Sequence, residues 1–295
     1  MAANQLPRQN QVVRDSSKHT RILDRLGEWA QRESSLPSVF QAYERLLRLQ
    51  MEARGRISIP PSGLTKEAAF SQLGQGIPLL KSEDLLPSLD WPLIEDVFRD
   101  AAGVLVEHTG QEPTAAMALG EIASDRSLLE QACGDWYQGR SLSSLAALKG
   151  VSEELLSATV QAALFPFLIA HAEALSGLVN HGVWRRKTCP VCGGKPDFAF
   201  LDKERGGRWL LCSRCDTEWL FQRMQCPYCD SQNQKSLSYF SNDQGLYRLY
   251  TCSECRSYIK AVDLRKANAE VLLPLERFLT AGIDRQALEA GYKAG

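Results

Sequence analysis

The residues with the clearest chemical role are eight cysteines, arranged as four CxxC pairs within 67 residues. A CxxC pair can turn two sulfurs toward one point, and two such pairs about twenty residues apart can complete a tetrahedral cage of four thiolates. The sequence therefore predicts two metal ions, each held by four cysteines. The predicted ligands are Cys189, Cys192, Cys212, Cys215, Cys226, Cys229, Cys252 and Cys255.

The four pairs form an internal repeat. Nineteen residues separate the first pair from the second, and 22 separate the third from the fourth. Each distal pair follows a similar extended segment, which begins at Arg208 in the first unit and at Arg248 in the second. We therefore favour consecutive pairing, in which each unit closes its own cage as a small ribbon. The spacing leaves open an interleaved pairing, in which the first CxxC pair shares a metal with the third.

Disulfide bonds are the alternative use for clustered cysteines, and the choice depends on the compartment. Residues 1–10 are polar and lack the apolar core of a secretory signal. We therefore expect a cytoplasmic protein, and a reducing compartment favours metal binding over disulfides. A third use is thiol oxidation and reduction by a CxxC pair, which requires an exposed cysteine with a lowered pKa.

A closed shell of four sulfurs leaves no open position for water or substrate, so both sites are expected to be structural. Tetrahedral sulfur coordination suits zinc and iron alike, and on chemistry alone we favour zinc. Cys189-Pro-Val-Cys192-Gly193 looks like a rubredoxin knuckle, whereas Asp216, Asp230 and Arg256 follow the other three pairs.

The remainder of the chain predicts mostly helices. Apolar residues recur at helical spacing near 22–29, 39–47 and 93–104, and further helices are expected over roughly 113–137 and 152–178. The last of these contains the most apolar stretch, residues 162–170, which is too short to cross a bilayer and is expected to be a buried helix. Within these helices, Cys133 and Trp136 are candidate core residues.

The predicted fold is therefore a multi-domain α plus small β protein. An all-α domain covers residues 1–180, two tandem rubredoxin-like or zinc-ribbon-like modules cover 181–221 and 222–266, and a C-terminal helix covers 267–295. One closing helix is expected near 268–292, docked onto one of the domains.

No enzyme motif is evident. The four histidines lack ligand or catalytic spacing, and His181 is expected to be a linker residue rather than a group that supports the metal ligands. Nucleic-acid binding is the main alternative for tandem ribbons, and residues 185–266 carry fifteen Lys/Arg against nine Asp/Glu. Eight thiolates and two divalent metals would compensate most of that excess, so we expect neither a nucleic-acid nor a membrane partner.

Several segments together resemble the formate dehydrogenase accessory protein FdhE family. The most specific is Leu211–Trp219, in which Asp-Thr-Glu-Trp follows the second CxxC pair. The similarity continues through Arg223–Cys226, Thr251–Cys255 and Tyr258–Asp263, and it begins in the helical segment Phe165–Leu175.

The resemblance implies a cytoplasmic maturation factor, not an enzyme, that binds the catalytic subunit of formate dehydrogenase. It implies rubredoxin-like iron sites, so the preferred metal shifts from zinc to iron. The iron would serve either as a scaffold or as an electron carrier. All eight cysteines are carried over as metal ligands. Thr217, Glu218, Trp219 and Asp263 are carried over as motif positions, with a role in partner contact or in ribbon packing.

Overall fold

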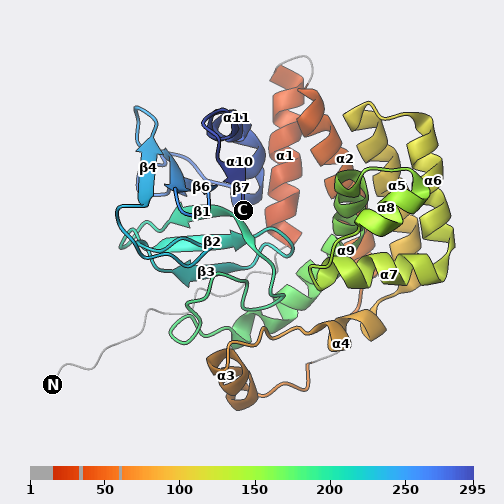
Figure 1. Cartoon of the computed structure of the whole chain (residues 1–295), viewed down its shortest axis with the longest axis horizontal. Coiled ribbons are helices and arrows are strands. Elements are labelled where there is room, and N and C mark those ends of the chain that lie inside the picture. Colours follow the sequence, from red (N-terminus) through yellow and green to blue (C-terminus); the bar gives the residue numbers. More distant parts are fainter. Residues whose placement is uncertain (1–15, 33–35, 60–61) are drawn as a thin grey trace.

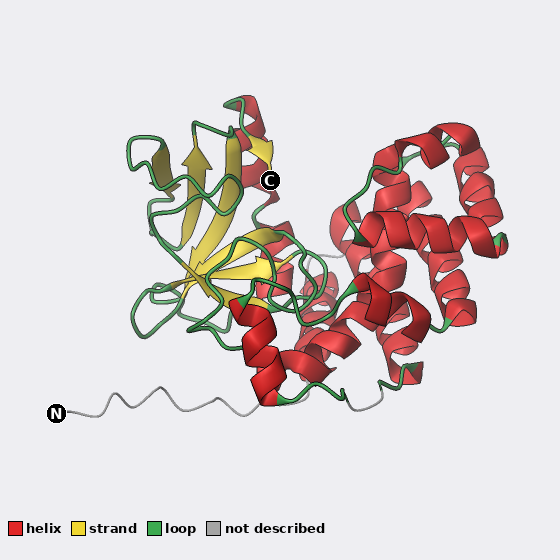
Figure 2. Cartoon of the chain, turned by 60° about the horizontal axis from the view of Figure 1, so that its bottom comes forward, coloured by secondary structure: helices red, strands yellow, loops and turns green. Residues whose placement is uncertain are grey.

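The computed structural model describes residues 16–32, 36–59 and 62–295, so residues 1–10, on which the compartment prediction depends, lie outside it. Helices fill the first part of the chain, strands the next, and two short helices follow (Figures 1 and 2). The larger helices are α1 (Ser16–Arg32), α2 (Ser38–Arg56), α3 (Lys66–Gly74), α5 (Trp91–Thr109), α6 (Pro113–Ser124), α7 (Arg126–Tyr137) and α9 (Glu153–Leu175); the shorter ones are α4 (Ser82–Leu85), η1 (Leu86–Ser88), α8 (Ser143–Lys149) and η2 (Ser176–Leu178).

The helical half is built around α5 and α9, which pack against each other and against α2. The side chain of the residue before each helix caps it: Asp90 accepts from the backbone N–H of Leu93 at 3.1 Å, and Ser152 from that of Leu155 at 3.1 Å. By length and composition the segment Glu153–Leu178 could cross a membrane, but 78% of its most apolar stretch is buried. The predicted buried helix over 162–170 is thus confirmed as part of α9.

One predicted helix is divided in the structure. The helix expected over 113–137 is wrong as a single element, because α6 ends at Ser124 and α7 begins at Arg126. Asp125 lies between them, and its carboxylate accepts from the backbone N–H groups of Ser127 and Leu128 at 3.0 and 3.2 Å. The apolar spacing runs through this break, whereas the capping carboxylate fixes a new helix start.

The strands join into one sheet. They are β1 (Pro196–Leu201), β2 (Arg208–Cys212), β3 (Glu218–Phe221), β4 (Leu237–Ser241), β5 (Tyr247–Cys252), β6 (Ser257–Asp263) and β7 (Lys293–Ala294), in the order β3-β2-β1-β6-β5-β4 with β7 beside β6. Each ribbon is an antiparallel three-stranded unit, and a parallel pair of β1 and β6 joins the two units. The two predicted modules therefore share one continuous sheet.

The C-terminal segment forms two helices, α10 (Leu273–Leu279) and α11 (Ala281–Glu289), so the single closing helix expected near 268–292 is wrong. Helix α10 packs against both halves: Leu272 and Leu275 join the core between α1 and α2, and Leu273 joins the apolar face of the sheet. Figure 1 shows α1, α10 and α11 between the sheet and the other helices. The predicted fold class, with a helical domain, tandem four-cysteine modules and a C-terminal helical segment, is confirmed.

Candidate metal centres

The first cysteine cluster lies at one end of β1 and β2, where two CxxC turns face each other. Its members are Cys189, Cys192, Cys212 and Cys215, whose sulfurs all lie within 4.8 Å of one another. The Sγ atom of Cys192 is 3.4 Å from those of Cys212 and Cys215, and the Sγ atoms of Cys189 and Cys215 are 3.7 Å apart.

The second cluster is built in the same way, from the CxxC turn that precedes β4 and the CxxC turn that follows β5. It contains Cys226, Cys229, Cys252 and Cys255. The Sγ–Sγ distances are 3.7 Å for Cys226–Cys255 and 3.7 Å for Cys229–Cys252. The structure thus groups the cysteines in sequence order, as consecutive pairing predicts, and the interleaved grouping does not occur.

Both clusters have dimensions suited to one tetrahedral metal. A metal–sulfur bond of about 2.3 Å gives sulfur–sulfur edges of about 3.8 Å in a regular tetrahedron. A disulfide would bring two sulfurs to about 2.05 Å, and all nine cysteines in the chain are free. The observed separations of 3.4–3.7 Å therefore fit coordination of two metal ions and do not fit disulfides.

All four CxxC turns adopt the same backbone conformation. The residue after the second cysteine has a positive φ in each: Gly193 at 71°, Asp216 at 53°, Asp230 at 63° and Arg256 at 57°. This left-handed region is uncommon for residues other than glycine, although aspartate tolerates it better than most. Gly193 therefore does not give the first turn a special backbone conformation, since the other three turns adopt the same left-handed conformation without glycine.

The two clusters differ in burial. In the first, all four cysteines are buried, with at most 4% of any residue exposed. In the second, Cys226 and Cys252 are buried, Cys255 is partly exposed and Cys229 is exposed. Solvent therefore reaches the second cluster directly, whereas the first is enclosed by protein.

Without a cation, the surroundings of Cys192, Cys226 and Cys229 raise the pKa of these thiols and so disfavour their thiolates. Hydrogen bonding to Cys189, Cys212 and Cys215, together with burial, raises the pKa of Cys192 well above its ordinary value. Cys255 is the exception: although burial acts to raise it, hydrogen bonds from Ser257 lower the pKa of Cys255 to about 7. A bound metal favours the thiolate at every ligand, because it supplies the missing positive charge.

The first cluster is attached to the helical half by backbone and side-chain contacts. The backbone N–H groups of Leu79 and Leu80 donate to the carbonyls of Pro190 and Val191, inside the first turn, at 2.9 and 2.8 Å. From the second turn, the Arg214 guanidinium donates to the carbonyls that end α7, those of Trp136 and Tyr137, at 3.1 and 2.9 Å. These attachments were not evident from the sequence, because nothing in the spacing of these residues marks them.

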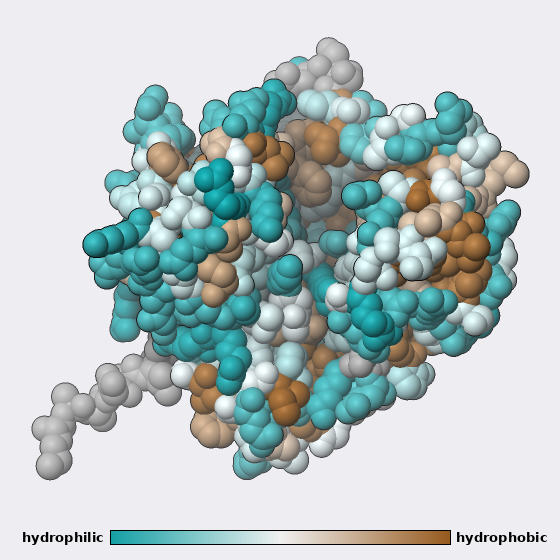
Figure 3. All heavy atoms as spheres, in the orientation of Figure 1, coloured by the Kyte–Doolittle hydropathy of each residue, from teal (hydrophilic) through white to brown (hydrophobic). Residues whose placement is uncertain are grey.

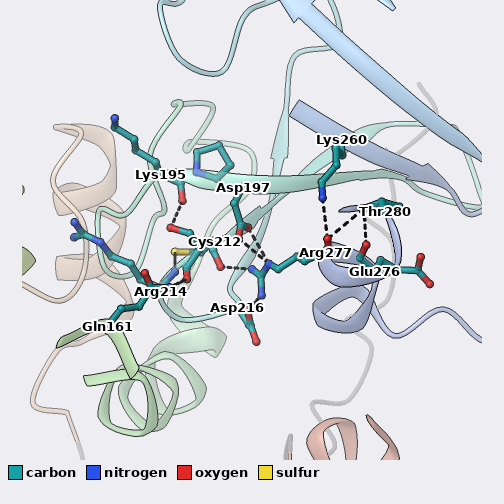
Figure 4. A network of polar contacts seen from close by, with 12 residues as sticks. Gln161, Lys195, Asp197, Cys212, Arg214, Asp216, Lys260, Glu276, Arg277 and Thr280 are labelled. Atoms are coloured by element: carbon teal, nitrogen blue, oxygen red, sulfur yellow. Dashed lines mark hydrogen bonds and ion pairs between the residues drawn. The ribbon is translucent and has the colours of Figure 1, made fainter. Parts of the chain in front are cut away.

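A partly buried ionic network attaches the same cluster to α10. Figure 4 shows Arg277 directed at three acceptors: Asp216 at 2.6 Å, Asp197 at 2.9 Å and the carbonyl of Cys212 at 2.7 Å. Burial acts to raise the pKa of Asp216, but Arg277 and His19 hold it well below its ordinary value. Asp216 therefore remains a buried carboxylate paired with Arg277.

The motif residues after the second CxxC pair pack within the protein. Trp219 is fully buried and its Nε1 donates to the carbonyl of Arg186 at 2.9 Å. Thr217 Oγ1 lies 3.1 Å from a cluster sulfur, and Glu218 pairs with Lys18 at 2.9 Å. Trp219 and Thr217 thus contact the ribbon itself, whereas Glu218 contacts α1 of the helical half.

Asp263 and His181 also contact neighbouring side chains within the protein. Asp263 accepts from Arg248 and Arg265, each at 2.7 Å, with its side chain fully buried. His181 lies outside both clusters, with its ring 4.8 Å from that of Trp209, and burial lowers the pKa of His181.

Cys133 is the one cysteine outside the clusters. It is fully buried in the helical core, as predicted, and Trp136 is buried beside it. Burial raises the pKa of Cys133 to about 12, so this thiol is inert.

The comparisons with known proteins agree on one family. Residues 188–223 match the family described as "FdhE, central domain". The chain is 31% identical over 226 residues to the protein FdhE homolog of Aquifex aeolicus, covering 75% of this chain and 74% of that protein. It is 31% identical over 150 residues to the Pseudomonas aeruginosa homolog, covering 44% and 47% of the two chains.

The crystal structure of the FdhE protein from Pseudomonas aeruginosa has the same fold. It superposes with a TM-score of 0.62 over 94% of this chain and 92% of that one, at 21% sequence identity. The fold, the cysteine clusters and the sequence similarity lead to one conclusion: this chain belongs to the FdhE family.

Proposed function

We propose that this protein is a cytoplasmic accessory factor for the maturation of formate dehydrogenase, acting by binding the catalytic subunit of that enzyme rather than by catalysis. The observation that carries the proposal is the pair of four-cysteine clusters in one sheet, in a chain of the FdhE family. A closed shell of four sulfurs supports a binding scaffold, because it offers no coordination position to a substrate.

The proposed ligands are the eight clustered cysteines, and the proposed metal is iron. Protein purified without oxygen is expected to contain two irons per chain and to show the red colour of a ferric tetrathiolate. A chelator is expected to remove the second metal well before the first, because Cys229 is exposed and the first cluster is enclosed. Elemental analysis and the visible spectrum check both expectations; two zinc ions without colour would refute iron.

The proposed contact surface has two parts, one on each half of the molecule. On the helical half, Met117 of α6 is 72% exposed and Leu148 of α8 is 74% exposed. Figure 3 shows apolar side chains gathered over these helices, while hydrophilic side chains cover most of the sheet half on this face. On the edge strand β4, Tyr239 and Phe240 are 57% and 60% exposed. Exposed apolar groups that lie next to one another mark protein contacts, whereas singly exposed ones are common on any protein surface.

Changing one exposed residue on each part tests this surface. Phe240→Asp and Leu148→Asp are each expected to weaken binding of the purified catalytic subunit by about 2 kcal/mol or more, roughly 30-fold, if they lie at the centre of the contact. Binding is measured by calorimetry on variants whose circular dichroism matches the unchanged protein. Phe70→Asp on α3, where the phenyl ring is similarly exposed, is the control. Wild-type affinity in both test variants would exclude this surface.

A further inference from the structure

Two arginines occupy equivalent positions in the two ribbons but have different partners. Arg208 and Arg248 each lie four residues before the first cysteine of the distal pair. In the second ribbon, Arg248 pairs at 2.7 Å with Asp263, which lies eight residues after the last cysteine. The equivalent position in the first ribbon is occupied by Arg223. The carboxylate that neutralises Arg248 therefore has no counterpart beside Arg208.

Arg208 is buried at the boundary between the ribbons. Only 2% of it is exposed, and its guanidinium lies 5.2 Å from the ring centre of Phe221 and 5.5 Å from that of Tyr250. Its Nη2 donates to the carbonyls of Gln222 and Gln225, in the segment that enters the second cluster. Among the residues that the structure describes, Arg208 has no carboxylate partner within 4.0 Å, and its Nε has no hydrogen-bond partner.

A buried guanidinium without a counter-charge is destabilising, so a negative charge is expected among its surroundings. Arg208 lines a cavity of about 30 Å³ together with Cys226 and Cys252 of the second cluster. Gln225 Oε1 and Thr251 Oγ1, from two further lining residues, are also buried without partners. Burial lowers the pKa of Arg208 to about 10, against the opposing effect of Tyr250 and Cys226. The second cluster and this arginine thus face the same small cavity.

We propose that Arg208 of the first ribbon is the counter-ion of the second metal centre. Four thiolates and a divalent metal carry a net charge of −2, and the guanidinium compensates part of it from within the protein. Because the charge comes from the other ribbon, metal affinity at the second centre depends on the docking of the two ribbons. This inference rests on the metal occupancy proposed above.

Zinc affinity at each centre tests the role of Arg208. The metal-free protein is titrated with zinc in competition with a chromophoric chelator, and the step that disappears in Cys229→Ser/Cys255→Ser is assigned to the second cluster. Arg208→Met is expected to lower the affinity of the second step by about 10- to 100-fold, as for other groups that support metal ligands, and to leave the first step unchanged.

Matched variants separate charge from packing. Arg208→Lys keeps the charge and is expected to retain most of the affinity, whereas equal losses in Arg208→Met and Arg208→Lys would overturn the proposal in favour of packing. Arg223→Asp places a carboxylate where Asp263 lies in the second ribbon, and by engaging Arg208 it is expected to lower the second affinity by about tenfold. Arg223→Met removes the same exposed cation without adding a carboxylate, so it is expected to bind as the unchanged protein does.

The results also separate this inference from the proposed function. An unchanged protein that takes up no metal at the second cluster would refute the metal assignment itself. An unchanged protein that takes up two metals, with a second affinity equal to that of Arg208→Met, would refute only the counter-ion role. If Arg208→Met does not fold, the comparison of Arg223→Asp with Arg223→Met decides: a weaker second step in the former supports the role, and equal steps overturn it.

Discussion

Cys192→Ser is expected to abolish metal binding at the first cluster and to unfold the first ribbon with part of the helical core. Cys192 is buried among three other sulfurs, and its cluster belongs to the same apolar core as α5, α7 and α9. A structural four-cysteine metal contributes roughly 10–16 kcal/mol of apparent binding energy in small zinc-binding peptides. That is comparable to the roughly 5–15 kcal/mol that stabilises an ordinary domain. Metal content and thermal unfolding followed by circular dichroism measure both effects.

Two other cysteine substitutions provide the matched controls. Cys133→Ser replaces a thiol that is equally buried but outside both clusters, and it is expected to destabilise by about 1–3 kcal/mol while leaving two metals bound. Cys229→Ser alters the exposed edge of the second cluster, and it is expected to remove one metal while the helical half remains folded. A Cys192→Ser protein that unfolds at the same temperature as Cys133→Ser would contradict a structural role for the first metal.

The parts of the fold that follow from local sequence were predictable. The CxxC spacing is a local property, so it identified the eight clustered cysteines, whereas their grouping in sequence order was favoured by the internal repeat and left open by the spacing. Apolar periodicity identified the helical half for the same reason. The shared conformation of the four turns does not follow from the glycine at 193, since Asp216, Asp230 and Arg256 adopt the same left-handed backbone without glycine.

Long-range features could not be predicted in this way. The parallel pairing of β1 with β6 joins residues about sixty positions apart, such as Ala199 and Ala261, and neither strand carries a signal for its partner. Helix α10 presents a similar case. Its apolar residues predicted a docked helix, but the role of Arg277 depends on where the chain returns, beside Asp197 and Asp216.

Arg277→Met is expected to lower the free energy of unfolding by about 3–5 kcal/mol, because breaking a buried ion pair leaves an uncompensated charge. Arg277 donates to Asp216, Asp197 and the carbonyl of Cys212. Its removal leaves Asp216, which is buried, without a guanidinium partner and with the His19 ring 3.6 Å away. Urea denaturation of the metal-loaded protein measures the change. Arg285→Met, on the exposed surface of α11, is expected to change stability by at most about 0.5 kcal/mol.

The double variant Arg277→Met/Asp216→Asn identifies the source of that loss. If an unpaired carboxylate causes it, replacing Asp216 by a neutral amide removes the cause, so the double variant is expected to be more stable than Arg277→Met alone. Two residues in one network are expected to show such non-additivity, with coupling of about 0.5–3 kcal/mol. If the two changes simply add, the contribution of Arg277 lies instead in its hydrogen bond to the Cys212 carbonyl, 2.7 Å away, and in holding α10 against the first cluster.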